Sequence, residues 1–147
     1  MKVRFYFYEL KSHYGHPPSL CQGSTVVNAF IPVAGDFNKY LLSAIDTDFS
    51  ENRYGDVDEA LAAVEKIEQG ELNEFDTGGQ GFCHHITQDR VRFEHSVFGE
   101  CPEWPIWCCT LAQYKAALQG YRRFLDMPRS IDTELIIELP EGEARCD

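Results

Sequence analysis

The sequence predicts an α+β fold in which a mainly antiparallel sheet packs its apolar face against two amphipathic helices. Residues 2–10 and 134–139 alternate apolar and polar side chains, as half-buried strands do. Residues 82–97 have the pattern of a β-hairpin, and the segments 56–70 and 110–128 carry apolar stripes of helical period. Hairpin strands combined with amphipathic helices favour a sheet that the helices cover on one side.

The composition is that of a single domain, residues 1–147. A hydrophobic fraction of 44% and an aromatic fraction of 13% suit a chain with a buried core, so disorder is expected only in the tail, residues 141–147. The N-terminus carries charges where a signal peptide needs an unbroken apolar run, and no segment reaches the roughly eighteen apolar residues of a membrane span. We therefore expect a cytoplasmic protein.

The net charge of −11 restricts the partners that the chain can have. Nucleic acid and anionic membranes would repel it at long range, so we expect neither as a partner. A charged partner should be basic.

The first third of the chain predicts two paired strands. Within residues 2–10, Val3, Phe5 and Phe7 fall on one face. The β-branched segment 24–33, "STVVNAFIPV", predicts a second strand that pairs with the first. The next stretch is ambiguous: its apolar spacing fits a helix of two turns, whereas "DTDFSEN" at 46–52 resembles a loop. The helical spacing is that of Phe37, Tyr40, Leu41 and Ala44.

The segment 56–70, "DVDEALAAVEKIEQG", gives the clearest helix prediction. Asp56 is expected to cap it, with Glu59 three residues on, and Gly70 to end it. Its apolar stripe consists of Val57, Ala60, Leu61, Val64 and Ile67. A second helix is predicted over 110–128, with Pro128 beyond its end; its stripe consists of Leu111, Tyr114, Leu118, Tyr121 and Leu125. A last strand, 134–139, is expected to point Leu135, Ile137 and Leu139 inward.

The predicted hairpin decides what its cysteine and histidines can do. If residues 82–87 and 90–97 pair across Gln88 and Asp89, then His84 faces Phe93 while Cys83 and His85 lie on the opposite side of the sheet. Cys83 and His84 therefore cannot bind one ion together. The other cysteines supply no CxxC spacing, and His13 and His16, although spaced like metal ligands, lie in a loop rich in proline and glycine, so we predict no metal site. "TGGQG" at 77–81 carries no lysine and predicts a turn, so no cofactor is expected either.

The six cysteines are expected to be reduced thiols, because a chain of this length without an export signal does not need a disulfide framework. Three of them lie in "CPEWPIWCC", residues 101–109, which we interpret as a wall of the core below the second helix. The alternative is a small enzyme with a cysteine nucleophile and a histidine base, drawn from Cys83, His84, His85 and Cys101. A scaffold subunit also fits the composition.

Acidic residues concentrate between positions 46 and 76. This segment contains eleven carboxylates and two basic residues, so it carries a net charge of −9 out of the total of −11. The simplest interpretation of such a block is a solvated face that keeps the protein soluble, which most charge runs are. As a functional surface it would steer a basic partner and occupy the groove where that partner holds a phosphate backbone. The candidate partner-binding residues are Asp46, Asp48, Glu51, Asp56, Asp58, Glu59, Glu65, Glu68, Glu71 and Glu74.

Three segments carry a resemblance to a known class of proteins: "EQGELNEF" after the acidic helix, the hairpin rhythm "HHITQDRVRFEH", and the helix "TLAQYKAALQGYRRFL". Over about residues 56–127 the chain resembles small immunity proteins of bacterial contact-dependent growth inhibition and related polymorphic toxin systems. The resemblance implies a cytoplasmic α+β antitoxin that binds and blocks one cognate toxin domain, often a nuclease, and that has no catalytic residues of its own.

Overall fold

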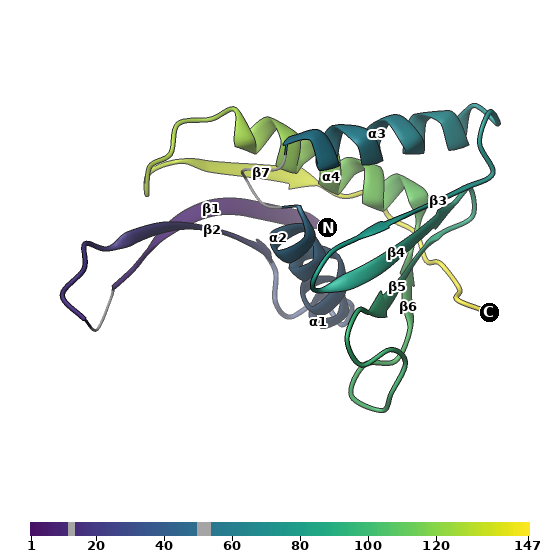
Figure 1. Ribbon diagram of the computed structural model, residues 1–147, viewed down its shortest axis with the longest axis horizontal. Helices are drawn as coiled ribbons and strands as arrows, with labels where there is room; N and C mark the ends of the chain where they lie inside the picture. Colours follow the sequence, from purple (N-terminus) through teal and green to yellow (C-terminus); the bar gives the residue numbers. More distant parts are fainter. Residues whose placement is uncertain (12–13, 50–53) are drawn as a thin grey trace.

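The computed structural model describes residues 1–11, 14–49 and 54–147, and their fold is α+β, as predicted. The strands form two antiparallel sheets rather than the single sheet expected, with the orders β2-β1-β7 and β3-β4-β5-β6 (Figure 1). The strands are β1 (Lys2–Leu10), β2 (Ser19–Val26), β3 (Glu74–Gly78), β4 (Phe82–Thr87), β5 (Val91–His95), β6 (Trp107–Cys109) and β7 (Glu134–Glu138). The helical segments are α1 (Ala34–Phe37), η1 (Asn38–Leu42, a stretch of π-helix), α2 (Ser43–Asp48), α3 (Tyr54–Glu68) and α4 (Leu111–Leu125).

Strand β1 has the predicted bounds and the predicted buried face. The pairing of β1 with β2 is also confirmed, but β2 spans 19–26 and not 24–33. The reason lies in the partner strand: Val26 pairs with Val3 and the Val27 amide donates to the Lys2 carbonyl, so β1 has no further residues for positions 28–33 to pair with. The chain turns instead into α1.

Residues 34–48 are helical throughout, so the loop predicted from Asp46 onward is wrong for Asp46, Thr47 and Asp48. The apolar spacing predicted the buried face correctly. Its members Phe37, Tyr40, Leu41 and Ala44 are all in the core. The helix continues because this stripe packs against both sheets, which outweighs the polar composition of the last turn.

Helix α3 begins at Tyr54, so Asp56 lies in its first turn and is not its cap. Gly70 ends the helix as predicted: its φ is 78°, and the amides of Gly70 and Glu71 donate to the carbonyls of Ile67 and Lys66. The predicted stripe faces the core, with only Leu61 half-buried. In Figure 1, α3 lies alongside α4.

Helix α4 packs against both sheets. Thr110 caps it in a capping box with Gln113, and Phe124 stacks on Phe5 and Phe7 of the first sheet at 5.8 and 4.7 Å between ring centroids. Tyr114 packs on Phe93 of the second sheet at 6.1 Å. The core therefore lies between the two sheets with α4 against both of them.

The β4–β5 hairpin has the predicted register, with His84 opposite Phe93 and the Thr87 amide donating to the Arg90 carbonyl. Strands β3 and β6, which flank it, were not predicted. One carries few apolar residues and the other has only three residues, so neither produces a periodic signal of its own. They are strands because the hairpin offers each of them an edge to pair with.

The tail, residues 141–147, was expected to be frayed, and this prediction is wrong. Gln113 Nε2 donates to the carbonyls of Pro140 and Gly142, and Arg90 donates to those of Arg145 and Asp147. Cys146 forms a disulfide with Cys108, so the expectation of six reduced thiols is also wrong. Cys21, Cys83, Cys101 and Cys109 are free thiols.

No helix among the described residues has the length and apolar character needed to cross a membrane.

Candidate functional site

The carboxylates of α3, of the turn after it and of β3 form the most strongly charged surface that the structure describes. Seven of them are exposed, against a single exposed lysine, Lys66, within residues 56–76. We call these seven residues the acidic surface: Asp58, Glu59, Glu65, Glu68, Glu71, Glu74 and Asp76. Six of the ten residues predicted from the sequence belong to it.

Two members of the acidic surface are tied to α4. Asp58 pairs with Arg122 at 3.0 Å and Glu68 with Lys115 at 2.8 Å, so one edge of the surface is partly neutralised. Glu59, Glu65 and Glu71 form no ion pair within residues 1–11, 14–49 and 54–147. Their charges face solvent and are open to a partner.

The other four predicted contact residues do not belong to this surface. Asp48 is 1% exposed, so its assignment to a partner-binding surface is wrong. Asp46 is mostly buried beside β2, where burial raises the pKa of its carboxyl to about 7 although the Ser24 hydroxyl donates to it at 3.0 Å. Asp56 is half-buried, and Glu51 lies outside the described residues. The available surface is therefore shorter than the acidic block in the sequence.

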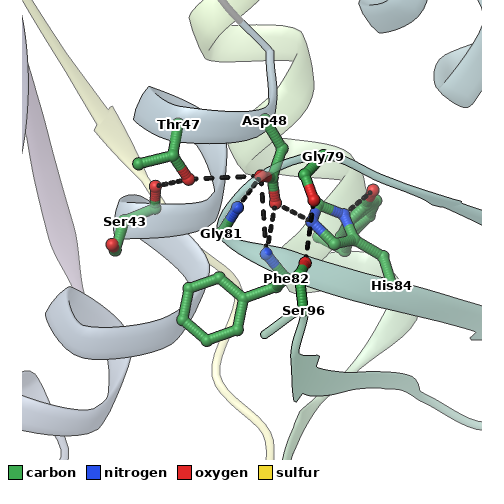
Figure 2. A network of polar contacts seen from close by, with 9 residues as sticks. Ser43, Thr47, Asp48, Gly79, Gly81, Phe82, His84 and Ser96 are labelled. Atoms are coloured by element: carbon green, nitrogen blue, oxygen red, sulfur yellow. Dashed lines mark hydrogen bonds and ion pairs between the residues drawn. The ribbon is translucent and has the colours of Figure 1, made fainter. Parts of the chain in front are cut away.

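Asp48 is instead the centre of a buried polar network (Figure 2). Its Oδ1 accepts from the Gly81 amide at 2.8 Å, and its Oδ2 accepts from the Phe82 amide at 3.2 Å. Oδ2 also lies 2.7 Å from Nε2 of His84. A Cβ at Gly79 or Gly81 would lie 2.9 and 3.1 Å from Oδ1, so the small residues of "TGGQG" allow the carboxylate to approach the backbone.

The network continues from His84 to Tyr114, whose hydroxyl lies 2.9 Å from Nδ1. Burial, with Cys109 and Asp48 nearby, raises the pKa of Tyr114, so its hydroxyl keeps its proton and can donate to Nδ1. Nε2 then carries the hydrogen that the Asp48 carboxylate accepts. The order of groups resembles a proton relay, but the side chains of Asp48 and His84 are both 0% exposed. No substrate reaches them in this conformation, so their role is structural.

The residues of the alternative enzyme are not assembled into one site. As predicted, Cys83 and His85 lie on the face of β4 opposite His84; His84 is buried, and the other face is the exposed one. His85 has a carboxylate partner, since Oδ1 of Asp76 lies 2.6 Å from its Nδ1. The cross-strand neighbour of Cys83, however, is the acid Glu94, whereas a nearby cation is needed to activate a thiolate. Cys101 lines a separate hollow with Phe98, Glu103 and Trp104. Among the described residues, no three His, Cys, Asp or Glu side chains are placed to hold a metal ion.

The "CPEWPIWCC" segment is a wall of the core, as predicted: Cys109 is buried and both tryptophans pack against the core. Trp104 also anchors an exposed loop that the sequence did not single out. His95 lies between Phe98 and Trp104, at 4.8 and 4.6 Å between ring centroids, and Phe98 is 65% exposed. This aromatic loop is the second surface with the features of a contact site.

Comparison of the chain with protein-family models, with curated proteins and with solved structures found no match in any of the three.

Proposed function

We propose that this protein is a cytoplasmic immunity protein that binds a basic toxin domain, of the nuclease type, through the acidic surface and blocks it without catalysing a reaction. The observation that supports the proposal is the imbalance of seven exposed carboxylates against one exposed lysine on α3, its following turn and β3. A nuclease binds the phosphate backbone with a cationic groove. A carboxylate-rich surface complements such a groove and excludes the substrate from it.

The ion pairs between α3 and α4 make the acidic surface a preorganised one. Asp58 and Glu68 fix α3 against Arg122 and Lys115, so the outward carboxylates are presented by a helix that is already docked. Less ordering is then needed when a partner binds. The charges are also concentrated on one side, which accelerates association with a basic partner at low ionic strength.

The test uses the toxin domain expected at the C-terminus of a large secreted protein encoded immediately upstream. The variant E59K/E65K/E71K reverses three carboxylates that form no ion pair in the described chain, while Asp58 and Glu68 keep their contacts with α4. The control E9K/E100K/D132K changes the net charge by the same amount at exposed positions on other loops and strands. Circular dichroism first checks that both variants are folded.

Stopped-flow association is then measured at low and at high salt. We expect the acidic-surface variant to associate about tenfold or more slowly at low salt, with a smaller difference at high salt because the charges are screened. The control should lose much less, and cells that express the toxin should lose protection only with the first variant. Equal rates for the two variants would exclude the acidic surface, and a neighbouring operon of metabolic genes would favour the enzyme.

A further inference from the structure

The last eight residues form a strap that is fastened to the body at its far end. We call residues 140–147 the C-terminal strap. Its cysteine, Cys146, is bonded to Cys108 of the edge strand β6, 38 residues earlier in the chain. In Figure 1 the strap leaves β7 and passes to the side of the molecule where β6 lies.

Apart from the disulfide, the strap has few attachments. Its base is held by Gln113 Nε2, which donates to the carbonyls of Pro140 and Gly142 at 3.1 and 3.0 Å. Its end is held by Arg90, which donates to the carbonyls of Arg145 and Asp147 at 3.1 and 3.2 Å. Five of the eight side chains are exposed acidic, proline or arginine residues, and the one nonpolar side chain that is half-buried is Ala144. Hydrophobic burial therefore contributes little to keeping the strap in place.

The strap covers a hollow with an apolar floor. A cavity of about 500 Å³ lies between the strap and the body, and a neighbouring one of about 250 Å³ shares Val33, Phe37, Gln113 and Gly142 with it. Four apolar residues form the floor of the larger cavity. Val33 precedes α1 and Phe37 ends it, whereas Ile106 precedes β6 and Trp107 begins it. Gly142, Glu143, Ala144 and Cys146 of the strap line the other side of this cavity. We call the two cavities together the strap groove.

We propose that the Cys108–Cys146 disulfide is a redox-operated clasp, which holds the strap over the strap groove when oxidised and releases it when a dithiol reduces the bond. Cys146 is the more exposed of the two sulfur-bearing residues, whereas Cys108 is 6% exposed. A thiolate of the reductant therefore attacks the Cys146 sulfur, and the Cys108 sulfur leaves as a thiolate and takes up a proton. Arg92 is the cross-strand partner of Cys108 in the register of β5 and β6.

The second thiol of the reductant then completes the exchange. In the mixed disulfide, the first sulfur of the reductant is bonded to the Cys146 sulfur. The second thiol attacks that first sulfur, so Cys146 is released as a thiol and the reductant ends as an intramolecular disulfide. Two electrons and two protons have passed from the dithiol to the protein. Within the described residues, the strap then retains the hydrogen bonds of Gln113 and Arg90, and those of Arg90 lie at an exposed site where water competes.

Trp107 lies in the strap groove and reports on the strap, so the test follows its accessibility in a W104F background, which leaves it as the only tryptophan. Acrylamide quenching is compared for the oxidised chain, the chain treated with dithiothreitol, the variant C146S, and a chain ending at Pro140. We expect the last three to share a quenching constant at least about twofold above that of the oxidised chain. The control C21S, which alters a free thiol elsewhere, should behave like its parent before and after reduction.

Mass spectrometry and circular dichroism complete the experiment. Alkylation of the denatured oxidised chain should give four adducts for the six cysteines, and six after reduction. Six adducts without reduction would overturn the proposal, since no clasp would exist. Equal quenching before and after confirmed reduction would overturn it because the strap would stay closed by itself. Loss of the far-ultraviolet circular dichroism signal on reduction would also overturn the proposal, because the disulfide would then be needed to keep the whole domain folded.

Discussion

Nε2 of His84 lies 2.7 Å from Oδ2 of Asp48, and both side chains are closed to solvent. The rings of Phe49 and Phe93 pack against the imidazole at 5.5 and 4.9 Å between centroids, so the contact is surrounded by apolar groups. The same carboxylate accepts from the amides at the start of β4. One acidic residue therefore joins the end of α2 to the central hairpin of the second sheet.

We expect Asp48→Ala to be among the most destabilising single substitutions in the chain. It leaves the buried imidazole of His84 and the amides of Gly81 and Phe82 without their acceptor, at a cost of about 3–5 kcal/mol of unfolding free energy. The matched control is Asp76→Ala, which removes a carboxylate 2.6 Å from His85 where the acid is 75% exposed. That loss should stay below about 1 kcal/mol. Urea unfolding measures both, and similar losses would contradict the structural role of the buried pair.

The contrast between Asp48 and its neighbours shows what the sequence can and cannot predict. The faces of β1, α3 and α4 and the register of the β4–β5 hairpin follow from periodicities within one segment, and these predictions were confirmed. Asp48 lies in the same acidic block as Asp58, and no local pattern separates them. Its burial depends on Gly81, Phe82 and His84, more than thirty positions away.

The same reason accounts for the other misses. The end of β2 is set by where β1 starts, and β6 exists because the hairpin offers it an edge. The clasp depends on Cys108 and Cys146 meeting at 5.5 Å between Cα atoms, which spacing in the sequence does not predict. The acidic surface was predicted in part because charge, unlike burial, is visible in composition.

Asp46 should make the stability of the protein depend on pH between about 4 and 7. Burial raises the pKa of its carboxyl from 3.8 to about 7 in the folded chain, so the folded state holds the proton more tightly than the unfolded state. The resulting stabilisation is fully present below the unfolded pKa and is lost as the pH rises through the folded one. At about 1.4 kcal/mol per pKa unit, its full size is on the order of 4 kcal/mol.

Urea unfolding at about pH 5, 6, 7 and 8 tests this expectation. Asp46→Asn keeps an oxygen that can accept from Ser24 and should remove this part of the pH dependence. Ser24→Ala removes the hydrogen bond that lowers the pKa and should shift the loss to higher pH. A wild-type profile that matches the Asp46→Asn profile at every pH would show that the carboxyl does not titrate in this range.

We expect the purified protein to bind no stoichiometric zinc. Cys83 and His84 point to opposite faces of β4, and the described residues include no three clustered ligands. A structural zinc contributes roughly 10 kcal/mol or more to folding, so a chelator would unfold a zinc-dependent domain. Elemental analysis and thermal unfolding with and without chelator provide the measurement. One zinc per chain, or a lowered melting temperature with chelator, would reject the prediction.

Gly120 of α4 is expected to be a sensitive position, because a side chain there would force Ile137 of β7 to shift. A Cβ at this position would lie 2.6 Å from Cδ1 of Ile137 and 3.2 Å from Cε2 of Phe5. Gly120→Ala should therefore lose about 1–3 kcal/mol of unfolding free energy by overpacking, although alanine favours a helix by about 1 kcal/mol. Gly35→Ala is the control, since a Cβ at Gly35 of α1 meets nothing within 4 Å and should not destabilise. Ile137→Val removes the crowded Cδ1, so G120A/I137V should lose less stability than the two single losses added together. An additive loss would mean that the strain at Gly120 arises from another contact.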